Sequence, residues 1–84
     1  MWWVYIVRCK DGSFYTGIAL DVERRLALHQ SGRGARYTRG RGPLSLWWCE
    51  GPLAHREALF EERRIKRLSH QRKEAMGGLS SPTS

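Results

Sequence analysis

The pattern of hydrophobic and polar positions along the first half of the chain predicts two paired strands. Residues 3–7 form a β-branched and aromatic run of strand length. Asp11 and Gly12 then predict a turn, and residues 13–18 have the pattern of a second strand. A β-hairpin is therefore expected here, and the aromatic-rich residues 44–49 are expected to add a third strand.

Capping residues and apolar spacing predict the first helix. Asp21 is a suitable N-cap, and Val22 and Leu26 place an apolar edge along the helix that follows. This helix should run to about Gln30. After it, residues 35–38 are expected to form a short helical turn within a glycine- and arginine-rich connection.

The chain after the third strand is expected to be helical. The longest helix is predicted over residues 53–68, with Pro52 at its start, and a last short helix should begin after Ser69. Gly77 and Gly78 are expected to end that helix. The resulting order, β-β-α-β-α-α, predicts an α/β fold of the α+β type, in which helices flank a small three-stranded antiparallel sheet.

The length of the chain limits its organisation. Eighty-four residues leave room for one small domain, which excludes a barrel enzyme or a doubly wound dinucleotide-binding fold. The chain has neither the long apolar run of a membrane helix nor the basic start of a signal peptide, so a cytoplasmic protein is expected. Cys9 and Cys49 are too few for a disulfide framework, and both are predicted to be buried free thiols.

Charge gives the first indication of a partner. Fifteen basic residues against eight acidic ones give a net charge of +7, and most of the basic residues are arginine, which matches phosphate with two hydrogen bonds. No acidic residue occurs between residues 24 and 42. Such a stretch favours nucleic acid over a merely solvated surface. The predicted contacts are Arg33, Arg36, Tyr37, Arg39 and Arg41.

Few residues in the chain suit catalysis. The spacing of the cysteines and histidines does not match a structural zinc site, and no phosphate-binding glycine loop follows a strand. Arg25 and His29 lie four residues apart, so they share one edge of the first helix. In the long helix, Glu61 falls on the apolar face and Glu62 at its margin. Periodicity leans toward Glu61 as the functional carboxylate but leaves the choice open.

The tyrosines of the hairpin occur in a familiar arrangement. Val4-Tyr5-Ile6 precedes Tyr15-Thr16-Gly17 by ten residues, and this pair of triplets resembles the signature of the GIY-YIG endonuclease superfamily. The segments 34–40 and 62–69 are similar to its small, stand-alone, single-domain bacterial branch. The resemblance implies a nuclease-like domain over residues 1–76, followed by a polar tail over residues 77–84.

The resemblance also assigns roles to particular residues. It implies that Arg25 is the catalytic arginine and that His29 matches a histidine of the branches that cut structured DNA. It implies that Glu62, rather than Glu61, is the ligand of one Mg²⁺ or Mn²⁺ ion. Tyr5 or Tyr15 would position or deprotonate the attacking water, with His29 as the other candidate base.

The implied function is metal-dependent hydrolysis of phosphodiester bonds in nucleic acid. DNA is favoured over RNA, in particular the structured or damaged DNA of repair and recombination. The alternative is a non-catalytic nucleic-acid-binding module that retains the fold. The sequence names no protein partner and no interface of a dimer.

Overall fold

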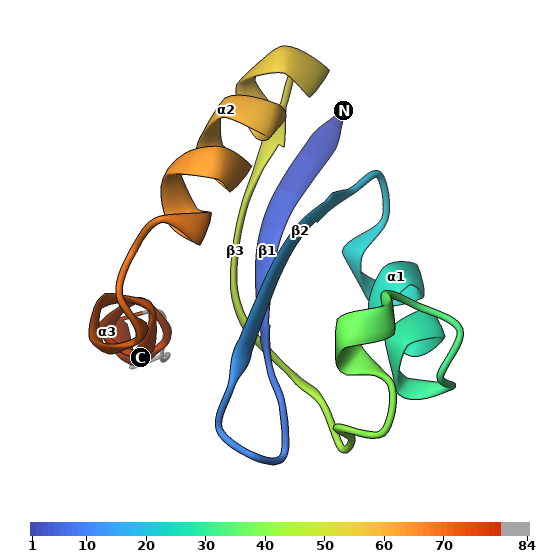
Figure 1. The fold of residues 1–84 in the computed structure, drawn as a ribbon. Coiled ribbons are helices and arrows are strands. Elements are labelled where there is room, and N and C mark those ends of the chain that lie inside the picture. Colours follow the sequence, from blue (N-terminus) through green and yellow to red (C-terminus); the bar gives the residue numbers. More distant parts are fainter. Residues whose placement is uncertain (80–84) are drawn as a thin grey trace.

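The computed structural model describes residues 1–79 of the chain. Its three strands form one antiparallel sheet in the order β2-β1-β3, and helices cover both faces, as Figure 1 shows. The predicted α+β fold and the predicted order of elements are confirmed. The elements are β1 (Trp2–Arg8), β2 (Phe14–Ala19), α1 (Val22–Gln30), the 3₁₀ helix η1 (Arg36–Thr38), β3 (Ser45–Leu53), α2 (His55–Lys66) and α3 (His70–Leu79).

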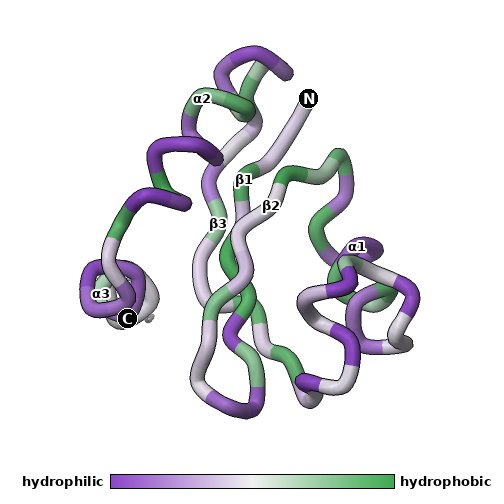
Figure 2. The backbone as a smooth tube through the Cα atoms, viewed as in Figure 1, coloured by the Kyte–Doolittle hydropathy of each residue, from purple (hydrophilic) through white to green (hydrophobic). Residues whose placement is uncertain are grey.

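The central strand β1 is buried on both faces. Val4 and Ile6 point into a cluster with α2, while Tyr5 and Val7 point into a second cluster beside α1. All four side chains are at most 1% exposed, which is why this strand reads as an unbroken apolar run rather than an alternating one. Figure 2 shows the hydrophobic stretches of the tube gathering along the strands, between helices that carry much of the polar character.

Helix α2 closes one layer through Ala58 and Ile65, both fully buried against β1. Ala54, four residues before Ala58, is exposed. The reason is that α2 begins at His55, so Ala54 lies before the first turn, where its backbone N–H donates to the Glu57 carboxylate (3.0 Å).

Helix α3 does not end where the sequence predicts. It continues through Gly77 and Gly78 to Leu79, while Ser69 caps its start as predicted, accepting a hydrogen bond from the backbone N–H of Arg72 (3.2 Å). A side chain at Gly77 would collide with the indole of Trp47. Gly77 is therefore a packing position that lets α3 approach the sheet, not a terminator. The rest of the predicted tail lies outside the described residues.

Strand β3 is longer than predicted and contains Pro52, which the sequence places at the start of a helix. The sheet order makes β3 an edge strand, paired with β1 alone, and an edge strand tolerates a residue that cannot donate a backbone hydrogen bond. The edge position of β3 also explains why one cysteine prediction is wrong. Cys9 is buried as predicted, but Cys49 lies on the edge strand and is exposed.

Helix α1 and η1 form the layer on the other face of the sheet, and Figure 1 shows them together on the side away from α2. Asp21 caps α1 as predicted, accepting a hydrogen bond from the backbone N–H of Arg24 (3.1 Å). The Gln30 side chain binds both the N–H and the carbonyl of Leu44. These bonds tie the end of α1 to the start of β3 and hold the connection between them against the domain.

Candidate active site

The site is built around Tyr5, in the middle of the central strand. Tyr5 pairs across the sheet with Gly17 of β2, so its side chain lies over a position that has no side chain of its own. A Cβ atom at Gly17 would come within 2.7 Å of the Tyr5 hydroxyl oxygen. The glycine of the second triplet thus provides the space through which the phenol reaches α1.

The Tyr5 hydroxyl meets the imidazole of His29 from α1. The distance from Tyr5 Oη to His29 Nε2 is 2.9 Å, and both residues are at most 2% exposed. Tyr15 packs edge-on against His29, with ring centroids 5.3 Å apart, and also contacts Tyr5 at 6.4 Å. The structure therefore brings together three of the residues that the sequence singles out, from two strands and one helix.

The other nitrogen of His29 is held by a segment that sequence reasoning did not assign to the site. The Ala35 backbone N–H donates to Nδ1 (3.2 Å), and Thr38 Oγ1 lies 3.0 Å from Nδ1. The Thr38 hydroxyl is also within 2.9 Å of the Ala35 carbonyl. Gly34 is required for this approach, because a Cβ there would overlap the imidazole ring.

Burial determines the protonation states of Tyr5 and His29. It raises the pKa of Tyr5 above that of an ordinary phenol, and the neighbouring Tyr15 adds to the rise. Burial lowers the pKa of His29, and the positive charge of Arg25 lowers it further. At neutral pH, Tyr5 is therefore a phenol and His29 a neutral imidazole. The charge of Arg25 acts to lower the pKa of Tyr5, but burial outweighs it.

Arg25 lies one turn before His29 on α1, and its side chain is exposed. Its charge acts on the pKa of both Tyr5 and His29, so the guanidinium is electrostatically coupled to the buried pair. An exposed cation beside two buried acid–base groups has the placement needed to meet an anionic substrate. The prediction that Arg25 and His29 share one edge of the helix agrees with this placement.

The two glutamates of α2 have different environments. Glu62 is the more buried, with 17% of its side chain exposed against 25% for Glu61. Glu61 is paired with Arg64 (2.8 Å), whereas Glu62 lies 3.3 Å from Lys66 through Oε2. The negative charge of Glu62 acts to raise the pKa of Tyr5, as the smallest of the influences on it.

Among residues 1–79, no three histidine, cysteine or acidic side chains lie close enough to form a complete protein metal cage. Such a cage is not what Mg²⁺ requires, because this ion keeps most of its water and is often held by one or two carboxylates together with substrate phosphates. Glu62 fits that pattern: its carboxylate is largely buried and has one oxygen, Oε1, outside the ion pair with Lys66.

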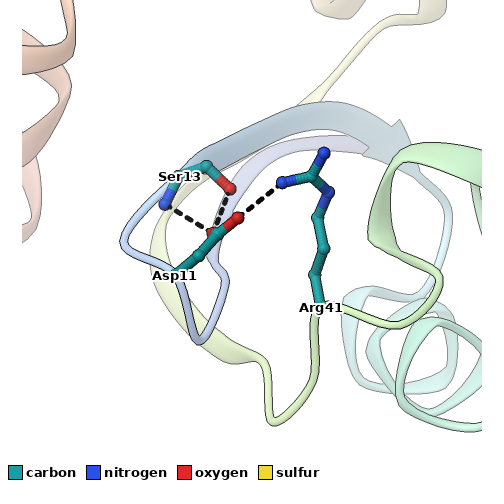
Figure 3. A network of polar contacts seen from close by, with 3 residues as sticks. All are labelled: Asp11, Ser13 and Arg41. Atoms are coloured by element: carbon teal, nitrogen blue, oxygen red, sulfur yellow. Dashed lines mark hydrogen bonds and ion pairs between the residues drawn. The ribbon is translucent and has the colours of Figure 1, made fainter.

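The basic segment, residues 33–41, is anchored to the rest of the domain. Arg41 forms an ion pair with Asp11 in the β1–β2 turn, as Figure 3 shows, and its guanidinium also lies over the Tyr37 ring at 4.4 Å. Hydrogen bonds from Ser13, and then the charge of Arg41, hold the pKa of Asp11 below its usual value. Arg41 and Tyr37 therefore connect this segment to the β1–β2 turn.

The remaining arginines of the basic segment are available to a partner. Arg33, Arg36 and Arg39 are exposed, and their guanidinium groups form no ion pair within the part of the chain that the structure describes. Tyr37 is 41% exposed and contacts the Tyr15 ring at 5.9 Å. Continuous ring contacts thus connect this segment to the centre through Tyr37 and Tyr15.

The sheet, the paired tyrosines and the coupled arginine, histidine and glutamate define a class of protein. The family profile described as the GIY-YIG catalytic domain matches residues 1–75. The chain belongs to the GIY-YIG family, which is a nuclease family.

In residues 1–79, no helix has the length and apolar character that crossing a membrane requires.

The relatives of the chain are small proteins of similar length. A UPF0213 protein of Halobacterium salinarum is 49% identical over 73 residues, which is 87% of this chain and 95% of the relative. A UPF0213 protein of Vibrio cholerae is 52% identical over 79 residues, 89% of this chain and 75% of the relative. The solution structure of a UPF0213 protein from Bacillus halodurans superposes with a TM-score of 0.60 at 46% identity, covering 99% of this chain and 90% of that one.

Proposed function

We propose that this protein is a metal-dependent endonuclease that hydrolyses phosphodiester bonds in structured or damaged DNA, in the cytoplasm, in repair or recombination. The observation that carries the proposal is the buried hydrogen bond between Tyr5 and His29, together with the exposed Arg25 one turn before His29 and the carboxylate of Glu62 on α2. Within a domain of a nuclease family, this arrangement supplies a base, a cation for the phosphate and a carboxylate for a metal ion.

Tyr5 and His29 act together as the general base. The Tyr5 hydroxyl oxygen accepts a proton from the attacking water while its own proton passes to His29 Nε2 along the 2.9 Å hydrogen bond. This transfer uses the tautomer of His29 that carries its hydrogen on Nδ1, because only then is Nε2 able to accept. The raised pKa of Tyr5 makes the phenol a poor base alone, which is why a partner is required.

Arg25 and Glu62 act on the phosphate. The exposed guanidinium of Arg25 neutralises the charge that develops on the non-bridging oxygens. Glu62 would hold one hydrated Mg²⁺ or Mn²⁺ ion through its carboxylate. When bound, the ion polarises the phosphate and stabilises the leaving 3′ oxygen. Tyr15 packs against His29 and Tyr5, so it orients both rings.

The proposed activity is tested by incubating the protein with labelled duplex, nicked, flap and branched DNA, and with matched RNA, in the presence of Mg²⁺ or Mn²⁺. Cleavage of at least one DNA structure that disappears with a chelator supports the proposal. Binding to every substrate without cleavage by either ion contradicts it.

One observation favours a non-catalytic DNA-binding module instead. Lys66 already neutralises Glu62 on its own helix, one turn away, and could leave the carboxylate without a ligand role. The two functions differ in what Lys66→Ala does. In an endonuclease, removing the competing ammonium lowers the concentration of Mn²⁺ needed for cleavage; in a binding module it changes DNA affinity only.

We predict that DNA binding is strongly dependent on salt through the basic segment. Replacing Arg36 and Arg39 together with alanine should reduce the slope of log affinity against log salt by about 0.9 for each phosphate of duplex DNA that the variant no longer neutralises. Fluorescence anisotropy between low and moderate salt measures the slope. Arg56→Ala, an exposed arginine on α2, is the matched control. An unchanged slope in the double variant would place the interface elsewhere.

We predict an acid limb in the pH–rate profile. His29 must be neutral to accept the Tyr5 proton, and burial holds its pKa below the ordinary histidine value of 6.5. Cleavage should therefore fall with decreasing pH only below about 6.5, and be level between about pH 7 and 9. A tenfold rise in the cleavage rate for each pH unit across that upper range would contradict the joint action of Tyr5 and His29. It would indicate that Tyr5 acts alone as phenolate. Single-turnover rates with the metal held constant measure the profile.

A further inference from the structure

The surroundings of His29 Nδ1 pose a problem of hydrogen bonding. A backbone N–H can only donate, so the contact from Ala35 holds Nδ1 without a hydrogen and leaves the hydrogen on Nε2. The Tyr5–His29 pair, acting as the general base, needs the opposite tautomer. Something must therefore stabilise a hydrogen on Nδ1 in the same buried site, where an unpaired donor would be costly.

The Thr38 hydroxyl is the group that meets this need. Its oxygen lies 3.0 Å from Nδ1 and 2.9 Å from the Ala35 carbonyl, so its single hydrogen has two acceptors within reach. Pointing at Nδ1, the hydroxyl donates to the bare nitrogen. Rotated toward the carbonyl of Ala35, it exposes a lone pair to Nδ1 and accepts a hydrogen from it. Thr38 is 2% exposed, so its hydroxyl is buried together with the ring that it contacts.

We propose that Thr38 is a positioning residue whose hydroxyl, by rotating, pairs with His29 Nδ1 whether or not that nitrogen carries a hydrogen, and that it thereby stabilises the tautomer in which Nε2 is free to take the proton of Tyr5. His29 reaches this tautomer by losing the Nε2 hydrogen to solvent and gaining one from solvent at Nδ1. The proposal rests on the nuclease function and deepens it. In the step it serves, the O–H bond of Tyr5 breaks and an N–H bond forms on Nε2. Tyr5 regains a proton from the attacking water in the same step, and the resulting imidazolium donates from Nδ1 to Thr38 and from Nε2 to the Tyr5 hydroxyl oxygen.

The same residue connects DNA binding to the centre. Thr38 ends η1, between Arg36 and Arg39, whose exposed side chains are proposed to bind phosphate. The ion pair of Arg41 with Asp11 fixes the far end of this segment on the hairpin. A phosphate held by the two arginines therefore keeps Thr38 against His29.

The test is the titration of His29 by ¹⁵N and ¹H NMR, which needs no cleavage and is therefore independent of the nuclease proposal. The titratable groups that face His29 are Tyr5 and Tyr15 from the strands and Arg25 from α1, and all three remain in every variant. Thr38→Val keeps the shape and removes the hydroxyl. The pKa of His29 should fall by at least about one unit, a tenfold reduction of proton affinity, because the imidazolium then has no acceptor at Nδ1.

Two further measurements complete the test. Thr38→Ser, which restores a hydroxyl, should return the pKa to its original value. In the unmodified protein, the Ala35 amide proton should shift upfield at the same midpoint, since protonation of Nδ1 removes its acceptor; this readout stands even where Thr38→Val does not fold. An unchanged His29 pKa in folded Thr38→Val, or an Ala35 amide that does not respond, overturns the proposal.

Discussion

Replacing Glu62 with glutamine is expected to eliminate metal-dependent hydrolysis while leaving DNA affinity in place. The carboxylate is the only proposed protein ligand of the ion, and an ion that polarises a phosphate contributes several kcal/mol of transition-state stabilisation, so the rate should fall by about 10²-fold or more. Single-turnover cleavage of the preferred substrate with Mn²⁺, and anisotropy without metal, measure the two quantities.

The Glu62→Gln variant should fold as well as the original chain. Its ion pair with Lys66 is a partly exposed i,i+4 contact, a type worth about 0.3–0.5 kcal/mol, so the melting temperature should change little. Removing the charge also removes one contribution to the raised pKa of Tyr5. A large loss of stability would instead indicate a structural carboxylate.

Glu61→Gln is the matched control, one residue away on the same helix. Glu61 is bound to Arg64 by two nitrogens at 2.8 Å, and the charge of Glu62, not that of Glu61, influences Tyr5. Its replacement should leave cleavage near the original rate. Full cleavage by Glu62→Gln, or equal loss in both variants, would contradict the assignment of Glu62.

Much of the fold could be predicted because local signals and packing agree. The apolar run of β1, the Asp21 cap and the Ser69 cap each predict the element that forms. The errors arise where tertiary contacts override local signals. Pro52 indicates a helix start in isolation, but the chain places it on an edge strand. Gly77 indicates a helix end, but its missing side chain serves the packing of α3 against Trp47.

Some residues of the candidate site could likewise be predicted from the sequence, and others could not. Tyr5, Tyr15 and His29 could be found from motif spacing, because regular strands and one helix set their positions. Thr38 and Gly34 could not, because their contact with His29 depends on how an irregular segment folds back over α1. Periodicity favours Glu61 over Glu62, and the structure finds both partly buried; an angle around a helix does not say which neighbouring charge each carboxylate meets.

Arg25→Ala is expected to reduce cleavage by about 10²–10³-fold while weakening DNA binding little. The reason is that a preorganised cation contributes most where charge develops, in the transition state, and less to the bound ground state. Arg25 has no ion-pair partner within residues 1–79, so its removal leaves no buried charge uncompensated. Single-turnover rates and anisotropy under identical salt separate the two effects.

The same variant has a second expected effect that does not depend on cleavage. The positive charge of Arg25 lowers the pKa of His29, so its removal should raise that pKa, and the acid limb of any remaining activity should move to higher pH. Arg24→Ala is the matched control, because Arg24 is its exposed neighbour on α1 and its charge is not among the influences on the His29 pKa. Equal reductions of binding and cleavage in Arg25→Ala, with an unmoved His29 pKa, would make Arg25 an ordinary phosphate contact rather than a catalytic residue.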